Sequence, residues 1–348
     1  MKKPGKYLIH VIFLLFLIAL TFFLLFKDQD LKPVIRILGE VPVGYVILGL
    51  LLVVIYVCSE SVIIKYLLKA VGVSVKLLNC IRYSFIGFFF SCITPSASGG
   101  QPAQIVYMRE EKVNIPSATI VLMLVTIEYK FVLVFTGVAL VLFGQSILQA
   151  FPAEALFYLY LGLALNVICI AIMIMLVFFP KTMEFVVNGL CNLLQKIKFI
   201  KKKEKLIKRI QNSVDNYSKA SEFLKKNYKA IVVTTLITFV QRFTLFAVTY
   251  VVYRSLGLNK TSFIEITLLQ ASISVAVDML PLPGGMGISE RIFNLIFVPI
   301  FGTVDIMLSG MLISRGISYY SLLILSGIIT LFSHITIMSK KNKQGGHL

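Results

Sequence analysis

Residues 280–287 read LPLPGGMG and interrupt a long apolar segment that covers residues 263–301. Residues 94–102, TPSASGGQP, interrupt a second apolar segment, residues 80–108, in a similar way. Proline breaks a helix, and irregular backbone inside a bilayer is tolerated only where protein or water covers it. Each segment therefore predicts an apolar helix, a break within the membrane and a second helix that leads back out.

The composition of the rest of the chain is that of a membrane protein. Of the 348 residues, 58% are apolar and 14% are charged, and the mean hydropathy is +0.89. Soluble domains carry about 25% charged residues and disordered chains have low hydrophobicity, so both classes are excluded. We predict an all-α polytopic membrane protein that forms one domain over residues 1–348. Apolar runs of about 20 residues predict six transmembrane helices, at residues 7–26, 43–64, 117–143, 155–179, 230–253 and 307–337.

The basic residues indicate which side of the membrane each loop faces. The chain has 34 Lys and Arg against 16 Asp and Glu. If the N-terminus is cytoplasmic, 25 Lys and Arg fall in cytoplasmic segments and 5 in outer segments. This asymmetry follows the positive-inside rule and places both termini in the cytoplasm. The count does not decide whether residues 263–301 re-enter the membrane or cross it twice, whereas residues 80–108 fit a re-entrant hairpin.

The longest polar segment covers residues 181–229 and is strongly basic. Apolar residues recur there at helical spacing between Leu206 and Tyr228, which is typical of an amphipathic helix on an anionic leaflet. A charged linker that obeys the positive-inside rule explains the segment equally well. A basic chain can also indicate nucleic-acid binding, but with this hydropathy we expect a membrane partner and no nucleic acid.

The two broken hairpins form an inverted repeat. Each lies between two full spans, and the spans that precede them, residues 43–64 and 230–253, run in opposite directions. Broken helices in inverted repeats are a recurring feature of transporters. A helix that starts after each Gly-Gly pair would present N–H groups and its positive dipole end to an anion such as a phosphate. The alternative is a tight turn that only permits close helix packing.

Ionisable residues inside apolar spans are costly and mark candidate functional sites. We hypothesise that the two breaks meet and form a polar headgroup cavity, in which Arg242 or Arg315 helps to hold the phosphate. Glu128, Asp278 and Glu290 would neutralise a cationic headgroup. Glu128 and Lys130 lie about 200° apart on a helix, so both cannot face one cavity. The predicted substrate-binding residues are Ser96, Ser98, Gly99, Gly100, Gln101, Glu128, Arg242, Asp278, Gly284, Gly285, Glu290 and Arg315, with Glu60, Lys130 and Arg291 as further candidates.

The sequence shows no pattern that is typical of catalysis or metal binding. Its five Cys form no CxxC pair and its three His lie far apart. The GGMG turn lacks the Lys-Ser/Thr of a phosphate-binding P-loop. We therefore expect no catalytic residue, no metal and no cofactor.

The loops PSASGGQPAQ (residues 95–104) and PLPGGMGISE (residues 281–290) resemble the two signature loops of the lysylphosphatidylglycerol synthase transmembrane family. The resemblance covers nearly the whole chain. It implies the flippase-like domain of the bacterial multiple peptide resistance factor, which moves an aminoacylated phosphatidylglycerol between leaflets and protects against cationic antimicrobial peptides. It also implies a bacterial cell membrane. The chain ends at Leu348 after a short basic tail, so we expect the soluble transferase domain and its synthase activity to be absent.

Other functions remain open at this point. The cargo could be a polyprenyl-phosphate or another lipid, and the chain could be the membrane subunit of a phosphatidylglycerol lysyltransferase or work with a separate lipid-modifying synthase. An ion-coupled solute carrier is a further alternative. As a partner, a second copy of the chain could form a homodimer with it.

Overall fold

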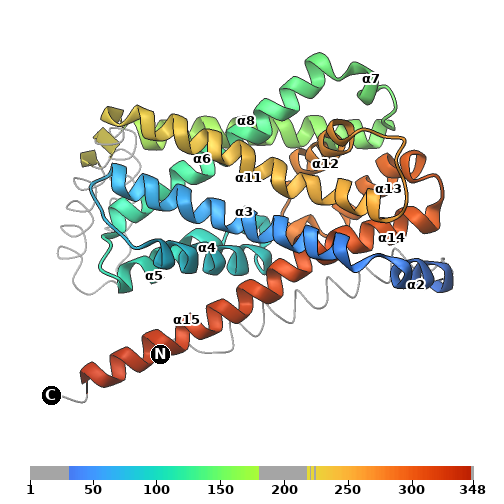
Figure 1. Ribbon diagram of the computed structural model, residues 1–348. Coiled ribbons are helices and arrows are strands. Elements are labelled where there is room, and N and C mark those ends of the chain that lie inside the picture. Colours follow the sequence, from blue (N-terminus) through green and yellow to red (C-terminus); the bar gives the residue numbers. More distant parts are fainter. Residues whose placement is uncertain (1–30, 180–217, 220, 223–224, 346–348) are drawn as a thin grey trace, which may run out of the picture.

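The computed structural model describes residues 31–179, 218, 219, 221, 222 and 225–345. Within these residues all regular elements are helices (Figure 1). Five helices are long and apolar enough to cross a membrane, which confirms the predicted all-α polytopic fold. They are α3 (Val43–Ala70), α6 (Ile115–Phe143), α8 (Ala153–Phe178), α11 (Tyr228–Ser255) and the continuous helix Val304–Thr336. The predicted first span and most of the basic segment 181–229 lie outside the described residues.

The two interrupted segments are pairs of short helices. The first pair is α4 (Leu77–Cys92) and α5 (Gly100–Glu110), and the second is α12 (Phe263–Val277) and α13 (Ile288–Phe301). The longest of the four has 16 residues, and crossing a bilayer takes about 20 helical residues. Each pair therefore fits a re-entrant hairpin, including the second pair, for which the sequence left two full crossings open.

The hairpins enter the bundle from opposite ends (Figure 1). Helices α3 and α11, which precede them, lie side by side along their length and run in opposite directions. The inverted arrangement predicted from the sequence is therefore present in the fold.

The two breaks also begin with the same backbone conformation. Thr94 and Leu282 are extended, with φ/ψ of −121°/145° and −123°/136°, and each precedes a proline that opens a single 3₁₀ turn. The next residue is left-handed in both turns, at φ 49° for Ser96 and φ 59° for Gly284. Left-handed backbone costs a non-glycine residue about 1–2 kcal/mol. Ser96 therefore keeps a strained turn that Gly284 adopts without that penalty.

The last long helix changes its winding beside the second break. It consists of α14 (Val304–Arg315), a π-helical segment η3 (Gly316–Tyr320) and α15 (Ser321–Gly345). Such π-helical insertions occur frequently at functional sites. Here the segment carries Tyr319, whose hydroxyl donates to the carbonyl oxygen of Cys92 at 2.8 Å, just before the first break.

A cavity between the two helix breaks

The two breaks are in direct contact. The hydroxyl of Ser96 in the first break donates to the carbonyl oxygen of Leu280, just before the 3₁₀ turn of the second break, at 3.2 Å. Segments that lie about half the chain apart are therefore joined at the centre of the bundle, as the inverted repeat predicted.

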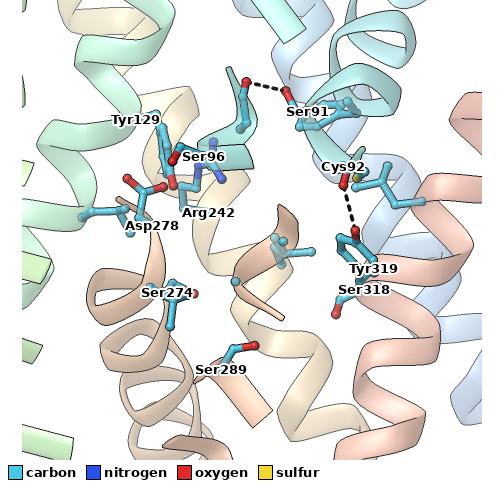
Figure 2. A pocket seen from close by; sticks show the side chains of 18 of the residues that line it. Ser91, Cys92, Ser96, Tyr129, Arg242, Ser274, Asp278, Ser289, Ser318 and Tyr319 are labelled. Atoms are coloured by element: carbon cyan, nitrogen blue, oxygen red, sulfur yellow. Dashed lines mark hydrogen bonds between the residues drawn. The ribbon is translucent and has the colours of Figure 1, made fainter. Parts of the chain in front are cut away.

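A cavity of about 570 Å³ lies at this junction. Residues of both breaks line it, together with residues of α3, α6, α8, α11, α12 and the last helix. Figure 2 shows Ser96, Tyr129, Arg242 and Asp278 around one part of this space and Ser318 and Tyr319 around another. The lining also includes the apolar or weakly polar side chains of Leu122, Val125, Cys169 and Met173, which come from α6 and α8. The cavity thus combines charged groups with a surface that suits hydrocarbon.

Three cations line the cavity, and one of them, Arg242, forms no salt bridge with a carboxylate within the described part of the chain. Its Nη1 donates to the hydroxyl of Tyr56 at 2.9 Å. Its guanidinium carbon lies 3.5 Å from the centre of the Tyr129 ring and 5.2 Å from that of Tyr56. Its buried Nε has no hydrogen-bond partner. Two aromatic rings therefore hold a positive charge in place through cation–π contacts.

The second cation of the cavity, Lys130, is already neutralised. Its Nζ lies 2.7 Å from Oδ2 of Asp278 and 3.1 Å from Oδ1 of Asn166. Both charged side chains are about nine-tenths buried. This pair joins α6 to the residue directly after α12, so it fixes the start of the second break.

The third cation, Arg315, pairs with Glu290 at 2.7 Å. Arg315 also donates to Ser289 and to the carbonyl oxygen of Gly284 at 3.2 Å. The Glu290 carboxylate accepts in turn from the backbone N–H of Gly287 at 2.7 Å. The expectation of open N–H groups after the second Gly-Gly is therefore not met at Gly287, because the protein's own carboxylate takes the place of an anion.

At the first break, two polar side chains form hydrogen bonds within the protein. Thr94 accepts from the N–H of Gly99 at 2.9 Å, and the amide of Gln101 donates to Thr126 and, at 3.0 Å, to the carbonyl oxygen of Leu122. No side chain caps the start of α5. The start of α5 therefore differs from that of α13, where Glu290 accepts from the N–H of Gly287.

Most predicted site residues line the cavity, and four do not. Glu60, Ser96, Ser98, Gln101, Lys130, Arg242, Asp278, Gly284, Gly285, Glu290 and Arg315 are part of its wall. Gly99, Gly100, Glu128 and Arg291 lie outside it.

The four residues outside the wall make contacts elsewhere in the protein. A Cβ atom at Gly100 would lie 2.2 Å from the hydroxyl oxygen of Ser91, so Gly100 serves close packing against α4, and one at Gly99 would lie 2.6 Å from Cγ2 of Thr94. Arg291 is exposed and pairs with Glu154. Glu128 accepts from Thr234 and Thr238 of α11. Since Lys130 lines the cavity and Glu128 does not, the prediction that both cannot face it is confirmed.

Three residues that were not predicted from the sequence, Tyr56, Tyr129 and Gln104, also line the cavity. Tyr56 and Tyr129 stack on Arg242, and Gln104 donates from Nε2 to Glu60 and to the carbonyl oxygen of Tyr83, both at 3.2 Å. Gln104 lies one helical turn after Gln101, which is a signal that could have been used. Tyrosines in an apolar span carry no such signal, because they also occur on lipid-facing surfaces.

Long apolar helices around a cavity that contains charged residues, with two discontinuous helices in inverted positions, define a polytopic membrane protein. Residues 8–326 match the family model of the lysylphosphatidylglycerol synthase TM region, and the chain belongs to this family. It is also similar to a UPF0104 membrane protein of Pyrococcus horikoshii, with 23% identity over 338 residues that cover 94% of this chain and 98% of that protein. The resemblance found in the two loops is thereby confirmed.

Proposed function

We propose that the protein is a lipid transporter, and not an enzyme, that moves an anionic or aminoacylated phospholipid between membrane leaflets. The observation that carries the proposal is the position of Arg242 in the cavity between the breaks. A charge inside a membrane protein is expensive to keep. This one is held by Tyr56 and Tyr129 and has no carboxylate partner among the described residues. A phosphate is the complementary ligand for a guanidinium group.

The remainder of the cavity fits the other parts of a phospholipid. Ser98 places a hydroxyl group on the cavity wall at the first break, where the start of α5 carries no side-chain cap, whereas the hydroxyl of Ser96 already donates to Leu280. Hydroxyls, helix N-termini and Arg are the usual donors to phosphate oxygens. The apolar lining residues of α6 and α8 would contact the acyl chains. The pairs Lys130–Asp278 and Arg315–Glu290 hold the second break in place and leave Arg242 to meet the ligand.

The family supports this reading at a coarser level. Its description names lysylphosphatidylglycerol, and in this chain we assign transport of a lipid of that kind. A polyprenyl-phosphate carries the same phosphate and would meet the same guanidinium group. An experiment is therefore needed to decide which of the two lipids is the cargo.

The test is translocation in liposomes that contain the purified full-length chain. Fluorescent phosphatidylglycerol, its lysyl derivative, phosphatidylcholine and a polyprenyl-phosphate are placed in one leaflet each, and their appearance in the other is followed by chemical quenching. We expect the lysyl or unmodified phosphatidylglycerol to move faster than in protein-free vesicles. Movement of the polyprenyl-phosphate alone would assign the second cargo. Background rates for all four lipids would contradict lipid transport.

We further propose that the protein resides in the bacterial cell membrane with its basic loops in the cytoplasm. Hydrogen bonds from Ser221 to the carbonyl oxygen of Val177 and from Asn227 to that of Ala70 gather the ends of α8 and α3 and the start of α11 at one end of the bundle. With Lys112→Cys and Lys260→Cys, an impermeant thiol reagent applied to whole cells should label the second and not the first. The reverse labelling would contradict this orientation.

A further inference from the structure

Glu60 is a carboxylate in the wall of the cavity. It has no role in the phosphate site proposed above. Its side chain is 8% exposed and it lines the cavity from α3, one helical turn after Tyr56. One hydrogen bond reaches it, from Nε2 of Gln104 at 3.2 Å. Within the described part of the chain it forms no salt bridge, whereas Asp278 and Glu290, the other cavity carboxylates, each have one.

The groups around Glu60 come from several elements. On α11, Arg242 lines the same cavity and is joined to α3 through the hydroxyl of Tyr56. On α6, Tyr129 stacks on Arg242, and Lys130 is held by Asp278. From α5, Gln104 supplies the one amide donor.

The tyrosines of the neighbouring α4 and η3 are occupied elsewhere. The hydroxyl of Tyr83 donates to Glu111 at 2.6 Å, and that of Tyr319 donates to the carbonyl oxygen of Cys92. The charge in the cavity that can balance Glu60 is therefore that of Arg242.

We infer that Glu60 takes up a proton when a phosphate binds at Arg242, so that binding and transport of the lipid are coupled to protons. Without a ligand, an ionised Glu60 and Arg242 leave the cavity with no net charge, although the two side chains form no salt bridge. A bound phosphate neutralises Arg242 and adds a second negative charge to a poorly solvated space. A like charge nearby favours the neutral carboxyl form. The two equilibria are linked, so a lower pH strengthens phosphate binding to the same extent that phosphate binding strengthens proton binding.

This inference rests on the proposed phosphate site and assigns the coupling ion of the same transporter. Because one carboxyl group is involved, at most one proton accompanies each lipid. A proton gradient across the membrane would then drive the phosphate-bearing headgroup in the direction of proton flow.

The test is a calorimetric titration of the full-length chain in detergent with dihexanoyl-phosphatidylglycerol, a soluble lipid with a phosphate and no amine. Titrations in two buffers of different ionisation enthalpy give the protons taken up per bound lipid. For the unaltered protein we expect uptake of up to one proton and an affinity that falls with rising pH, by about tenfold per pH unit at most. Lipid binding without proton uptake would overturn the inference and leave the proposed phosphate site intact. If no binding is detected, both fail.

Two variants show whether Glu60 is the group that takes up the proton. Glu60→Gln should bind the lipid with no proton uptake and with an affinity that does not change with pH. Glu128→Gln is the matched control, because Glu128 is equally buried, at 2% exposure, but lies outside the cavity. It should behave as the unaltered protein does. The inference is wrong if Glu60→Gln takes up as many protons as the unaltered protein does.

A further variant covers the case in which Glu60→Gln does not fold. Gln104→Leu removes the one donor to Glu60 and so disfavours its ionised form. It should shift the pH dependence of the affinity to higher pH. An unshifted profile would count against Glu60.

Discussion

Ser96 donates a hydrogen bond from its hydroxyl to the carbonyl oxygen of Leu280, at 3.2 Å, and thereby joins the two helix breaks. The contact lies beside the cavity, which Ser96 itself lines. The two breaks are thus connected to each other. A substitution at one break should therefore alter the structure or stability of the other.

Removal of this hydrogen bond should weaken the junction. Ser96→Ala keeps the backbone strain of a non-glycine residue and loses the bond, at a cost of about 1 kcal/mol. We expect a lower thermal unfolding temperature in detergent. Ser98→Ala is the control, because Ser98 lines the cavity and no side-chain hydrogen bond is described for it. Equal unfolding temperatures for both variants would contradict a stabilising role for this contact.

The second break should not tolerate a side chain at Gly284. A Cβ atom there would lie 2.3 Å from Cε2 of Tyr319, and the position is left-handed with φ 59°. Gly284→Ala should therefore displace Tyr319 and reduce both stability and lipid binding. Gly287→Ala is the control for backbone strain without a steric clash. Its φ is 82°, also left-handed, but a Cβ atom there would have no atom within 4 Å. If both variants lose the same amount of stability, contact with Tyr319 is not the cause.

The ion pair between Lys130 and Asp278 should behave as a unit. Removal of one partner of a buried pair leaves an unpaired charge and costs about 3–5 kcal/mol. We expect Lys130→Met and Asp278→Asn each to lower the unfolding temperature strongly, and the double variant to be more stable than the sum of the two losses predicts. Additive losses in a double-mutant cycle would show that the two residues do not interact in solution.

The spans and the breaks could be predicted from the sequence because each has a local physical cause. A run of apolar residues must meet lipid or protein, and a proline followed by glycines cannot continue a helix. Helical periodicity even showed that Glu128 and Lys130 cannot share a cavity. It could not show which of the two lines it, because that depends on the rotation of α6 against its neighbours.

The pairing of the charges could not be predicted, because partners meet only in the folded bundle. Asp278 and Lys130 lie 148 positions apart in the chain, and nothing local indicates that they meet. Glu290 was expected to face a cationic headgroup, and in the fold it pairs with Arg315 and accepts from the N–H of Gly287. Arg242 was one of two candidates for the phosphate, and the aromatic residues that hold it come from α3 and α6.

The most direct test of the central claim is the role of Arg242 in lipid binding and translocation. Arg242→Ala should reduce the translocation of phosphatidylglycerol in liposomes to the protein-free rate and abolish calorimetric binding of its dihexanoyl form. Arg242→Lys keeps the charge but loses the planar contact with Tyr129, so we expect an intermediate result. Arg291→Ala is the matched control, because Arg291 is exposed, pairs with Glu154 and lies outside the cavity. It should leave both measurements unchanged. Translocation and binding by folded Arg242→Ala at the rates of the unaltered protein would contradict the account.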